Sequence, residues 1–546
     1  MSSECPRLAE SGPGADGVGV ATPVLLGYKS AMARRHWFWL LPALLAGCPH
    51  TPAATANVVC LNRCGSGGSL PGALHEFTLA GTGQEALSFP SSTHLALLLS
   101  ASGSALQGPV DFKIQAAPRV AEMALSDSWR WHGPLSLHGA GGTLRSVQAI
   151  PQALDMWINT GDSTAAGDCL RHVVQVYHSA HAYFYLDEGP GAGVTGACAA
   201  PGLQPTQAVP SGTVPALTFS QGVSMLAKAF EQGFTSATDP LPGAAPIYPT
   251  VTGLFGPDPG GDSPPAGDPT FVVISPAVDD FGQQHGLMGY FWERDMQTVV
   301  DTPGDPRQHS NQRPVVFLSD QIYAEQPYTT YGTLAHEFTH LVVYYQRTKE
   351  GVGANETWWN EALAMLSMDR CGYGWKAGNQ DMAKDLNSFL QQPSAYSLTD
   401  WDQDPHGFAY GLVSLFARYL FDRFGPAFIH EVELAPDGGI TALDAALQER
   451  GTSFEAVYED FMISIYASSQ GLALGGVWQL APDLNMRGLY GSVQLAGVQT
   501  QPAPPGGGLQ LPVWSTAFFD LSQGQSAPWN FSLTSPGPMF GSGISF

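Results

Sequence analysis

The sequence is poor in positive charge, in charged residues overall and in long apolar runs. Lys and Arg number 23 against 47 Asp and Glu, a formal net charge of −24, so the chain would repel a phosphate backbone, which argues against nucleic-acid binding. Charged residues make up only 13% of the chain, which excludes a coiled coil. No apolar run reaches the roughly 18 residues that a membrane-spanning helix needs.

The sequence does contain ample material for packed cores. Its 546 residues, 44% of them hydrophobic, predict roughly two to four domains. The 63 Gly and 43 Pro favour short strands and loops over long exposed helices. We therefore expect a multidomain globular protein.

An export signal is predicted near the N-terminus. Arg34 and Arg35 precede an apolar run over residues 37–47, which has the length of a signal-peptide core and is too short to span a bilayer. This pattern implies a start at Met32, with residues 1–31 as a non-native extension. A buried hydrophobic helix is the alternative interpretation.

The end of this run, Leu45-Ala46-Gly47-Cys48, resembles the bacterial lipobox. The resemblance implies cleavage before Cys48 and lipidation of that residue, which would tether the protein to the bacterial cell envelope, at the outer membrane or the cell surface. Residues 32–47 are then the signal peptide, and residues 48–75, rich in Ala, Thr, Gly and Ser, are a flexible tether.

Cysteine usage agrees with an oxidising compartment. Behind the lipobox, short spacings predict two disulfides, Cys60 with Cys64 and Cys169 with Cys198, and leave Cys371 free. A zinc cluster is the rival interpretation of Cys60 and Cys64, but no second pair of ligands lies near them in the sequence.

Short strand-like runs between Gly, Pro and Ser clusters predict a β-sandwich-like domain over residues 76–200. The runs include His94–Leu99, Val110–Ile114 and Val173–Leu186. A Pro- and Gly-rich stretch over residues 201–215 marks the expected domain boundary.

An α+β catalytic domain with a helix-rich second half is predicted over residues 216–470. It opens with a helix at Phe219–Phe234, where apolar residues recur every three or four positions. Three runs have the content of buried strands, namely Phe271–Ile274, Leu287–Trp292 and Val315–Leu318. Residues 471–546 are expected to form a short β-rich segment.

The strongest chemical signal is the motif His336-Glu337-Phe338-Thr339-His340. On a helix, histidines four positions apart project from one face and can bind one zinc ion, with the intervening carboxylate close to a metal-activated water. Chance would supply about 0.04 such matches in a chain of this composition. A helical apolar stripe supports the segment, formed by Leu334, Phe338, Leu341, Val342 and Tyr345.

A catalytic zinc site needs a third protein ligand and an open fourth position. Glu361 fits this role because it follows His340 by 21 residues, enough for one helix to end and a second to pack beside it. Its neighbours are Trp, Ala and Leu, among which an unpaired carboxylate is costly. Asn360 could orient a ligating imidazole through the second ring nitrogen; a helix N-cap is the alternative for Asn360.

The region from Phe271 to Gly425 resembles the hyicolysin-type neutral zinc metallopeptidases of the gluzincin group, which combine HExxH with a downstream Asn-Glu helix. The resemblance covers under half of the chain and implies that His336, His340 and Glu361 bind zinc and that Glu337 is the general base. Further matches are Gly289-Tyr290-Phe291, Asp295, the segment from Ser310 to Leu318, Tyr410-Gly411, Arg418-Tyr419-Leu420 and Asp422-Arg423-Phe424-Gly425.

Two positions depart from the pattern of that group. Ala362 stands where Gly is common, and Met365 stands where some gluzincins place an Asp that orients a ligand. Asp369, two turns from Glu361, is the candidate substitute for that Asp.

The oxyanion of peptide hydrolysis needs a donor besides the metal. Residues 404–418 offer His406 and Tyr410. We favour Tyr410, because its phenol donates without being charged and Tyr410-Gly411 matches the family; packing into the core is the alternative for this ring. Elsewhere, hard oxygen donors in a Gly- and Pro-rich loop suit calcium, although a solvated loop is the favoured interpretation of Asp258, Asp262 and Asp268.

Together these features predict a lipid-anchored zinc endopeptidase that hydrolyses peptide bonds of proteins at the bacterial cell envelope. The alternative is a surface lipoprotein with a binding role whose peptidase-like core is inactive. The presence of three ligands and a base argues against that loss. An aminopeptidase would need an acidic pocket for the free amine of its substrate, and no motif supplies one.

Overall fold

The computed structural model describes residues 73–79, 83–102, 111–114, 152–159, 168–193, 198, 201–210, 217–262, 268–278, 288–401, 409–502, 509–535 and 538–545. The predicted signal peptide, Cys48, the tether and the pair Cys60 and Cys64 lie outside these residues, as does His406. Within them, no helix is long and apolar enough to cross a membrane.

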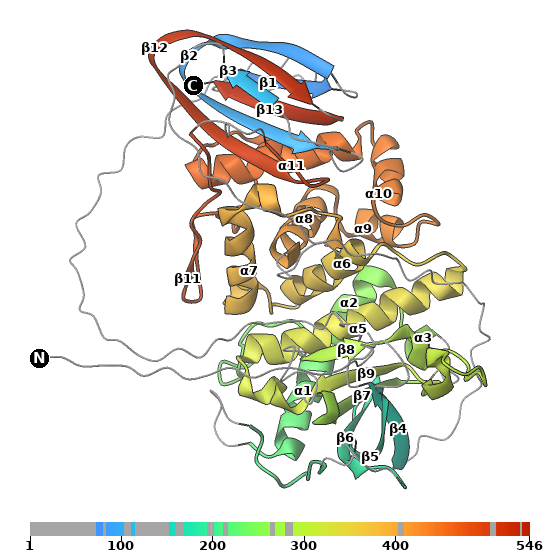
Figure 1. Cartoon of the computed structure of the whole chain (residues 1–546). Coiled ribbons are helices and arrows are strands. Elements are labelled where there is room, and N and C mark those ends of the chain that lie inside the picture. Colours follow the sequence, from blue (N-terminus) through green and yellow to red (C-terminus); the bar gives the residue numbers. More distant parts are fainter. Residues whose placement is uncertain are drawn as a thin grey trace, which may run out of the picture.

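A six-stranded sheet forms one end of the molecule (Figure 1). Its strand order is β4-β5-β6-β7-β9-β8, in which β6, β7 and β9 are parallel neighbours and the other pairs are antiparallel. Three predicted strands are confirmed as β7, β8 and β9, although β8 is shorter than expected. The bounds are β4 Ala153–Asn159, β5 Asp168–His178, β6 Ala182–Pro190, β7 Thr270–Ser275, β8 Gly289–Phe291 and β9 Val315–Ser319.

Helices cover one face of this sheet. Alternate residues of β7 point to opposite faces, so Val272 and Ile274 pack with the helices while Phe271 and Val273 join a second apolar cluster. The predicted helix that begins at Phe219 is confirmed as the first of them. These helices are α1 Phe219–Glu231, α2 Ile247–Phe255 and α5 Pro327–Glu350.

Side chains tie the two edges of this sheet together. Asn311 donates through Nδ2 to the carbonyl of Trp157 (2.8 Å) and accepts the N–H of Trp157 at Oδ1 (2.9 Å). Its side-chain amide thus forms with β4 the pair of hydrogen bonds that a neighbouring strand would form. The hydroxyl of Tyr290 on β8 accepts the N–H of Asn159 at the end of β4 (2.8 Å). The edge strand β8 is therefore held in place beside α5.

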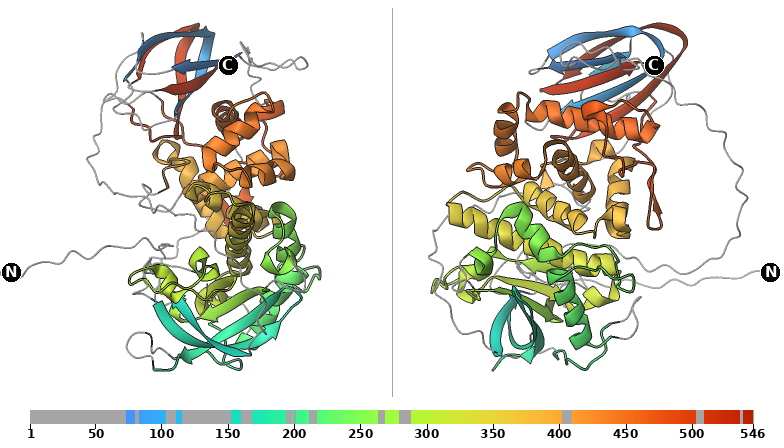
Figure 2. Two further views of the ribbon diagram at one scale, coloured as in Figure 1. Left: turned by 90° about the vertical axis from the view of Figure 1, so that its right-hand side faces the viewer. Right: turned by 180° about the vertical axis from the view of Figure 1, so that it is seen from behind.

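A second sheet, at the opposite end of the molecule, joins the two ends of the described chain (Figure 2). Its order is β1-β13-β2-β12-β3, with every pair antiparallel, so strands from before and after the predicted catalytic domain alternate. The bounds are β1 Ala73–Leu79, β2 Gly83–Ala101, β3 Asp111–Ile114, β12 Thr516–Ser535 and β13 Met539–Ser545.

This arrangement corrects the predicted domain organisation. The described strands of residues 76–200 do not form a sandwich of their own: β1 to β3 pair with the C-terminal strands, and β4 to β6 share a sheet with β7 to β9. The run Val173–Leu186, expected as a single strand, bends between β5 and β6. The C-terminal segment is β-rich as predicted, but it pairs with the N-terminal strands.

A layer of helices lies between the two sheets (Figures 1 and 2). α11 contacts the second sheet, with Tyr458 near Phe540 and Tyr466 stacked near Phe518. The layer comprises α6 Thr357–Arg370, α7 Gln380–Gln391, α8 Ala409–Phe424, α9 Pro426–Glu433, α10 Gly439–Gln448 and α11 Phe454–Gln470. Shorter elements are α3 Pro259–Asp262, β10 Leu489–Tyr490 and β11 Val493–Gln494. The mixed α/β, multidomain-like class is as expected.

One predicted disulfide is confirmed. Cys169 on β5 is bonded to Cys198. Cys371, after the end of α6, is a buried free cysteine, as the sequence predicted.

Candidate metal centre

The two histidines of the motif lie on α5, which the sequence bounds clearly. Pro327 occupies the first turn, and Gly351 ends the helix in the left-handed conformation at φ 68°. The main core includes Leu334, Phe338, Leu341 and Val342 of the apolar stripe, which leaves the face with His336 and His340 turned towards α6.

Glu361 comes from the second turn of α6 and meets both imidazoles. His336 Nε2 lies 3.1 Å from His340 Nε2 and 3.2 Å from Glu361 Oε2, and His340 Nε2 lies 3.5 Å from Glu361 Oε1. Ligand atoms placed tetrahedrally about 2.0–2.1 Å from a zinc ion are roughly 3.3 Å apart. The three distances therefore match the edges of a tetrahedral site.

The donor chemistry also fits a cation. Two ring nitrogens that face each other at 3.1 Å offer lone pairs to a shared ion, and the carboxylate of Glu361 faces both of them. Within that part of the chain, these three side chains are the one His, Cys, Asp and Glu group whose ligand atoms could hold a metal ion. The group could thus hold a metal ion, as predicted.

The electrostatics of His340 and Glu361 favour metal-binding protonation states, whereas those of His336 favour its protonated form. Burial lowers the pKa of His340 to about 4, which leaves its imidazole neutral. Burial alone would raise the pKa of Glu361, but the electrostatic attraction of His340, a hydrogen bond and attraction from His336, and a hydrogen bond from Tyr410 outweigh it and lower the pKa to about 2. Burial also acts to lower the pKa of His336, but Glu361 and Glu337 outweigh it and raise the value.

Glu337 lies beside the metal group and is held by the main chain of β8. Its Oε2 accepts the N–H of Phe291 at 2.9 Å. Burial raises the pKa of Glu337 to about 7, opposed by the charge of His336 and by the bond from Phe291. A carboxyl group with a pKa near neutrality can both take up and release a proton at physiological pH.

Tyr410 approaches the same group from α8. Its side chain is buried, its ring centroid lies 6.5 Å from that of His336, and Trp401 packs edge-on against it at 4.6 Å. Its hydroxyl hydrogen bonds to the Glu361 carboxylate. The structure thus brings Tyr410 to the site, as predicted, and the ring also packs into the core.

Asn360 does not take either role predicted for it. Glu356 is the N-cap of α6 and Asn360 is the fourth residue of the helix, so the N-cap interpretation is wrong. The buried Oδ1 of Asn360 has no hydrogen-bond partner among the described residues. It therefore does not accept an imidazole N–H.

Asp369 does not substitute for the missing ligand-orienting Asp. Its carboxylate pairs with Arg418 of α8 at 2.7 Å, and the same guanidinium binds Asp422 and Asp483. Burial raises the pKa of Asp369, and the charges acting on it are those of Arg418, Arg370 and Asp483. Asp369 thus joins α6 to α8 and is not part of the metal group.

The calcium interpretation gains no support. Asp258 accepts hydrogen bonds from the Tyr248 hydroxyl, the Gly261 N–H and the Thr270 hydroxyl at 2.9–3.0 Å, so its oxygens are already used. The side chain of Asp262 lies outside the described residues. The buried Oδ1 of Asp268 has no hydrogen-bond partner among them, but neither Asp258 nor Asp268 belongs to a group of side chains there that could hold a metal ion.

Two groups on or beside α5 were missed by the sequence analysis. The N–H of Phe291 is a main-chain donor, which leaves no mark in a side-chain pattern. Arg347, two turns after His340, is 3% exposed. An arginine in the last turn before a helix-ending Gly is a signal that could have drawn attention to it.

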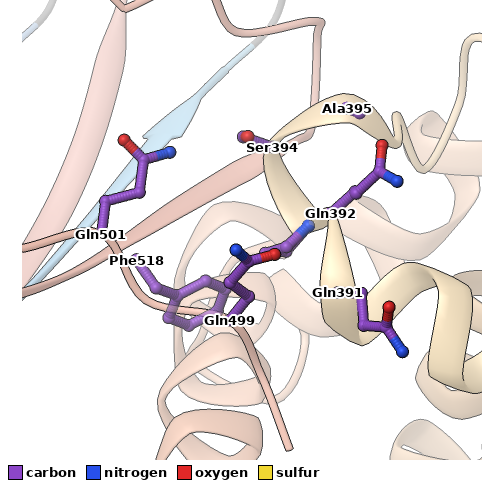
Figure 3. Close-up of a pocket in the computed structure, with 8 residues that line it drawn as sticks. Gln391, Gln392, Ser394, Ala395, Gln499, Gln501 and Phe518 are labelled. Carbon is purple, nitrogen blue, oxygen red and sulfur yellow. The ribbon is translucent and has the colours of Figure 1, made fainter. Parts of the chain in front are cut away.

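A separate pocket of about 200 Å³ contains none of these residues. Figure 3 shows it between the end of α7 and the segment around Gln501, beside the ring of Phe518. Four of its eight lining residues are glutamines, and none of the eight is an acid or a base. We assign no chemistry to this pocket.

Comparison of the chain with protein-family models and with curated proteins finds no match.

Proposed function

We propose that the protein is a zinc-dependent endopeptidase of the gluzincin type. The single observation that carries the proposal is the meeting of His336, His340 and Glu361 at distances of 3.1–3.5 Å, with Glu337 next to them. Two imidazoles and a carboxylate are the ligand set of known zinc peptidases with an open fourth position. Zinc is favoured over calcium or magnesium, which prefer oxygen donors.

In the proposed chemistry, the metal ion, Glu337 and Tyr410 have separate roles. A bound zinc ion supplies Lewis acidity, which lowers the pKa of water and polarises a carbonyl. Glu337 accepts a proton from the attacking water and returns it to the leaving amine. Tyr410, a neutral donor beside Glu361, stabilises the negative charge that develops on the carbonyl oxygen.

The position of β8 supports a polypeptide substrate. Within the described residues, β8 pairs with β9 alone and stands at the edge of the sheet. An extended peptide can add to such an edge through main-chain hydrogen bonds. Because Phe291 on this strand contacts Glu337, a peptide bound there would pass close to the proposed base.

The proposal also includes export and a lipid anchor on Cys48, which depend on the sequence pattern alone. The envelope of a bacterium is then the proposed location, and proteins or peptides there are the proposed substrates.

Casein hydrolysis by the purified mature chain tests the proposal. We expect cleavage inside the casein chain, its loss in the presence of a zinc chelator and its return when zinc is added. Glu337→Gln is the matched control, because the amide keeps the size of the side chain and an acceptor for Phe291 but not the base. No cleavage by the zinc-loaded wild type, or equal cleavage by Glu337→Gln, would contradict the proposal.

A further inference from the structure

The metal ligands come from two helices, so their spacing depends on the connection between those helices. His336 and His340 lie on α5, and Glu361 lies on α6. Residues 351–356 join the end of one helix to the start of the other. A tetrahedral site tolerates only small errors in ligand position, so something must hold this connection in place.

Arg347 fixes the first half of the connection. Its buried guanidinium donates through Nε to the carbonyl of Gly353 at 2.6 Å, through one terminal nitrogen to the carbonyl of Glu433, and through the other to the carbonyl of Ala435 at 3.2 Å. The last two carbonyls lie at the C-terminal end of α9, where main-chain acceptors lack helix partners and carry partial negative charge. The planar guanidinium of Arg347 thus binds both the connection and the end of α9.

Glu356 fixes the second half from the other side. It is the N-cap of α6, and its carboxylate accepts the indole N–H of Trp358 at 2.5 Å. The same carboxyl group packs against Gly439, the first residue of α10: a Cβ added to Gly439 would lie 2.1 Å from Glu356 Cδ. Gly439 also has φ +55°, a conformation that other residues adopt with strain.

We infer that Arg347 and Glu356 are positioning residues for the metal site, which act by locking the connection between α5 and α6 onto the turn between α9 and α10. The inference rests on the proposed metal site. Residues 434–439 supply no ligand. By this inference, they nevertheless help to set the distance between the two histidines and Glu361.

A purely structural role for the same contacts makes a different prediction. If Arg347 only joined α5 to α9, its loss would lower the free energy of unfolding but leave the zinc affinity of the folded protein unchanged. A positioning role requires that zinc affinity fall in protein that is still folded. Residues that orient ligands from outside the ligand set typically change metal affinity by about 10- to 100-fold.

The test is zinc affinity, measured on the full chain by competition with a chromophoric chelator at a temperature where circular dichroism shows folded protein. Arg347→Lys keeps the positive charge but loses the planar guanidinium and its several donors. Gly439→Ala adds a methyl group that would clash with the carboxyl group of Glu356. We expect each to raise the zinc dissociation constant by about 10- to 100-fold. Arg423→Lys is the matched control, because Arg423 binds Asp460 and the Tyr419 hydroxyl away from the connection, and it should leave the zinc dissociation constant unchanged.

The outcomes separate this inference from the proposed function. If the wild type binds no zinc, the proposed function fails. If the wild type binds zinc and the folded variants bind it within twofold of the wild type, the positioning inference fails and the proposed function stands. Should only one variant fold, that variant decides; if neither folds, the contacts serve the fold as a whole and the inference is overturned.

Discussion

Replacing Glu433 by Gln should stabilise the folded protein, and the gain should grow with pH. Glu433 ends α9 with a side chain that is 0% exposed, and among the described residues neither carboxylate oxygen has a hydrogen-bond partner. His430 Nδ1, 4.0 Å away, is too far to donate. Burial therefore raises the pKa of Glu433 to about 8, although Arg347 opposes it.

The magnitude and its sign follow from proton linkage. In the unfolded chain Glu433 loses its proton near pH 4.5, whereas in the folded protein it keeps the proton to about pH 8. Between these values the folded state binds the extra proton, so stability falls as pH rises, by about 1.4 kcal/mol per pH unit. From pH 5 to pH 8, Glu433 should lower the free energy of unfolding by about 4 kcal/mol. Because Gln does not titrate, the free energy of unfolding of Glu433→Gln should not fall in this way as the pH rises.

Urea unfolding of the wild type and Glu433→Gln at pH 5, 6.5 and 8, followed by tryptophan fluorescence, measures the effect. Glu431→Gln on the same helix is the control with the opposite sign, because a hydrogen bond from Arg450 lowers the pKa of the exposed Glu431. The free energy of unfolding of Glu431→Gln should therefore not exceed that of the wild type at pH 8. The reasoning is refuted if Glu433→Gln differs from the wild type equally at all three pH values, or if the wild type is the more stable at pH 8.

Three further predictions concern the site and the disulfide. Glu337→Gln should lower kcat on casein by about 10²- to 10⁴-fold with one zinc still bound, measured by cleavage rate and metal analysis; a loss below tenfold would contradict the base assignment. Tyr410→Phe keeps the ring against Trp401 but loses the hydroxyl, so steady-state kinetics should show kcat falling by more than KM changes, and an unchanged kcat would leave Tyr410 a packing residue. Replacing Cys169 and Cys198 together by Ala should lower the free energy of unfolding in urea by about 3–4 kcal/mol, from the 29-residue separation that the bond closes, whereas no measurable loss would contradict the chain-entropy argument.

The metal group could be predicted from the sequence because its geometry is mostly local. The helix period alone places His336 and His340 on one face. The position of Glu361 followed from the cost of a carboxylate among Trp, Ala and Leu and from the length of chain after His340. Each of these inferences needs only residues within two adjacent helices.

The surroundings of the group could not be predicted in the same way, because they depend on contacts between distant segments. Asp369, two turns after Glu361, is the candidate for a ligand-orienting carboxylate, but it forms an ion pair with Arg418 on α8 instead. The bond from Phe291 to Glu337 depends on where a short edge strand lies relative to α5. Arg347 likewise shows its role only when α9 is seen beside the end of α5.

The domain organisation was mispredicted for a related reason. Strand content is a local property, and β2, β7 and β9 were all recognised from composition. Strand pairing is not local: β1 pairs with β13, more than 400 residues away in the chain, and β6 pairs with β7 across the expected boundary. A Pro-rich connector such as residues 201–215 marks a loop, but it does not show which sheet the chain joins next.

The central claim is that His336, His340 and Glu361 bind one zinc ion, and zinc K-edge X-ray absorption on the purified chain tests it most directly. The account predicts a shell of nitrogen and oxygen ligands at about 2.0–2.1 Å, outer-shell scattering from two imidazoles, and loss of bound zinc in Glu361→Ala. Sulfur ligands at about 2.3 Å, or a spectrum unchanged by Glu361→Ala, would contradict it.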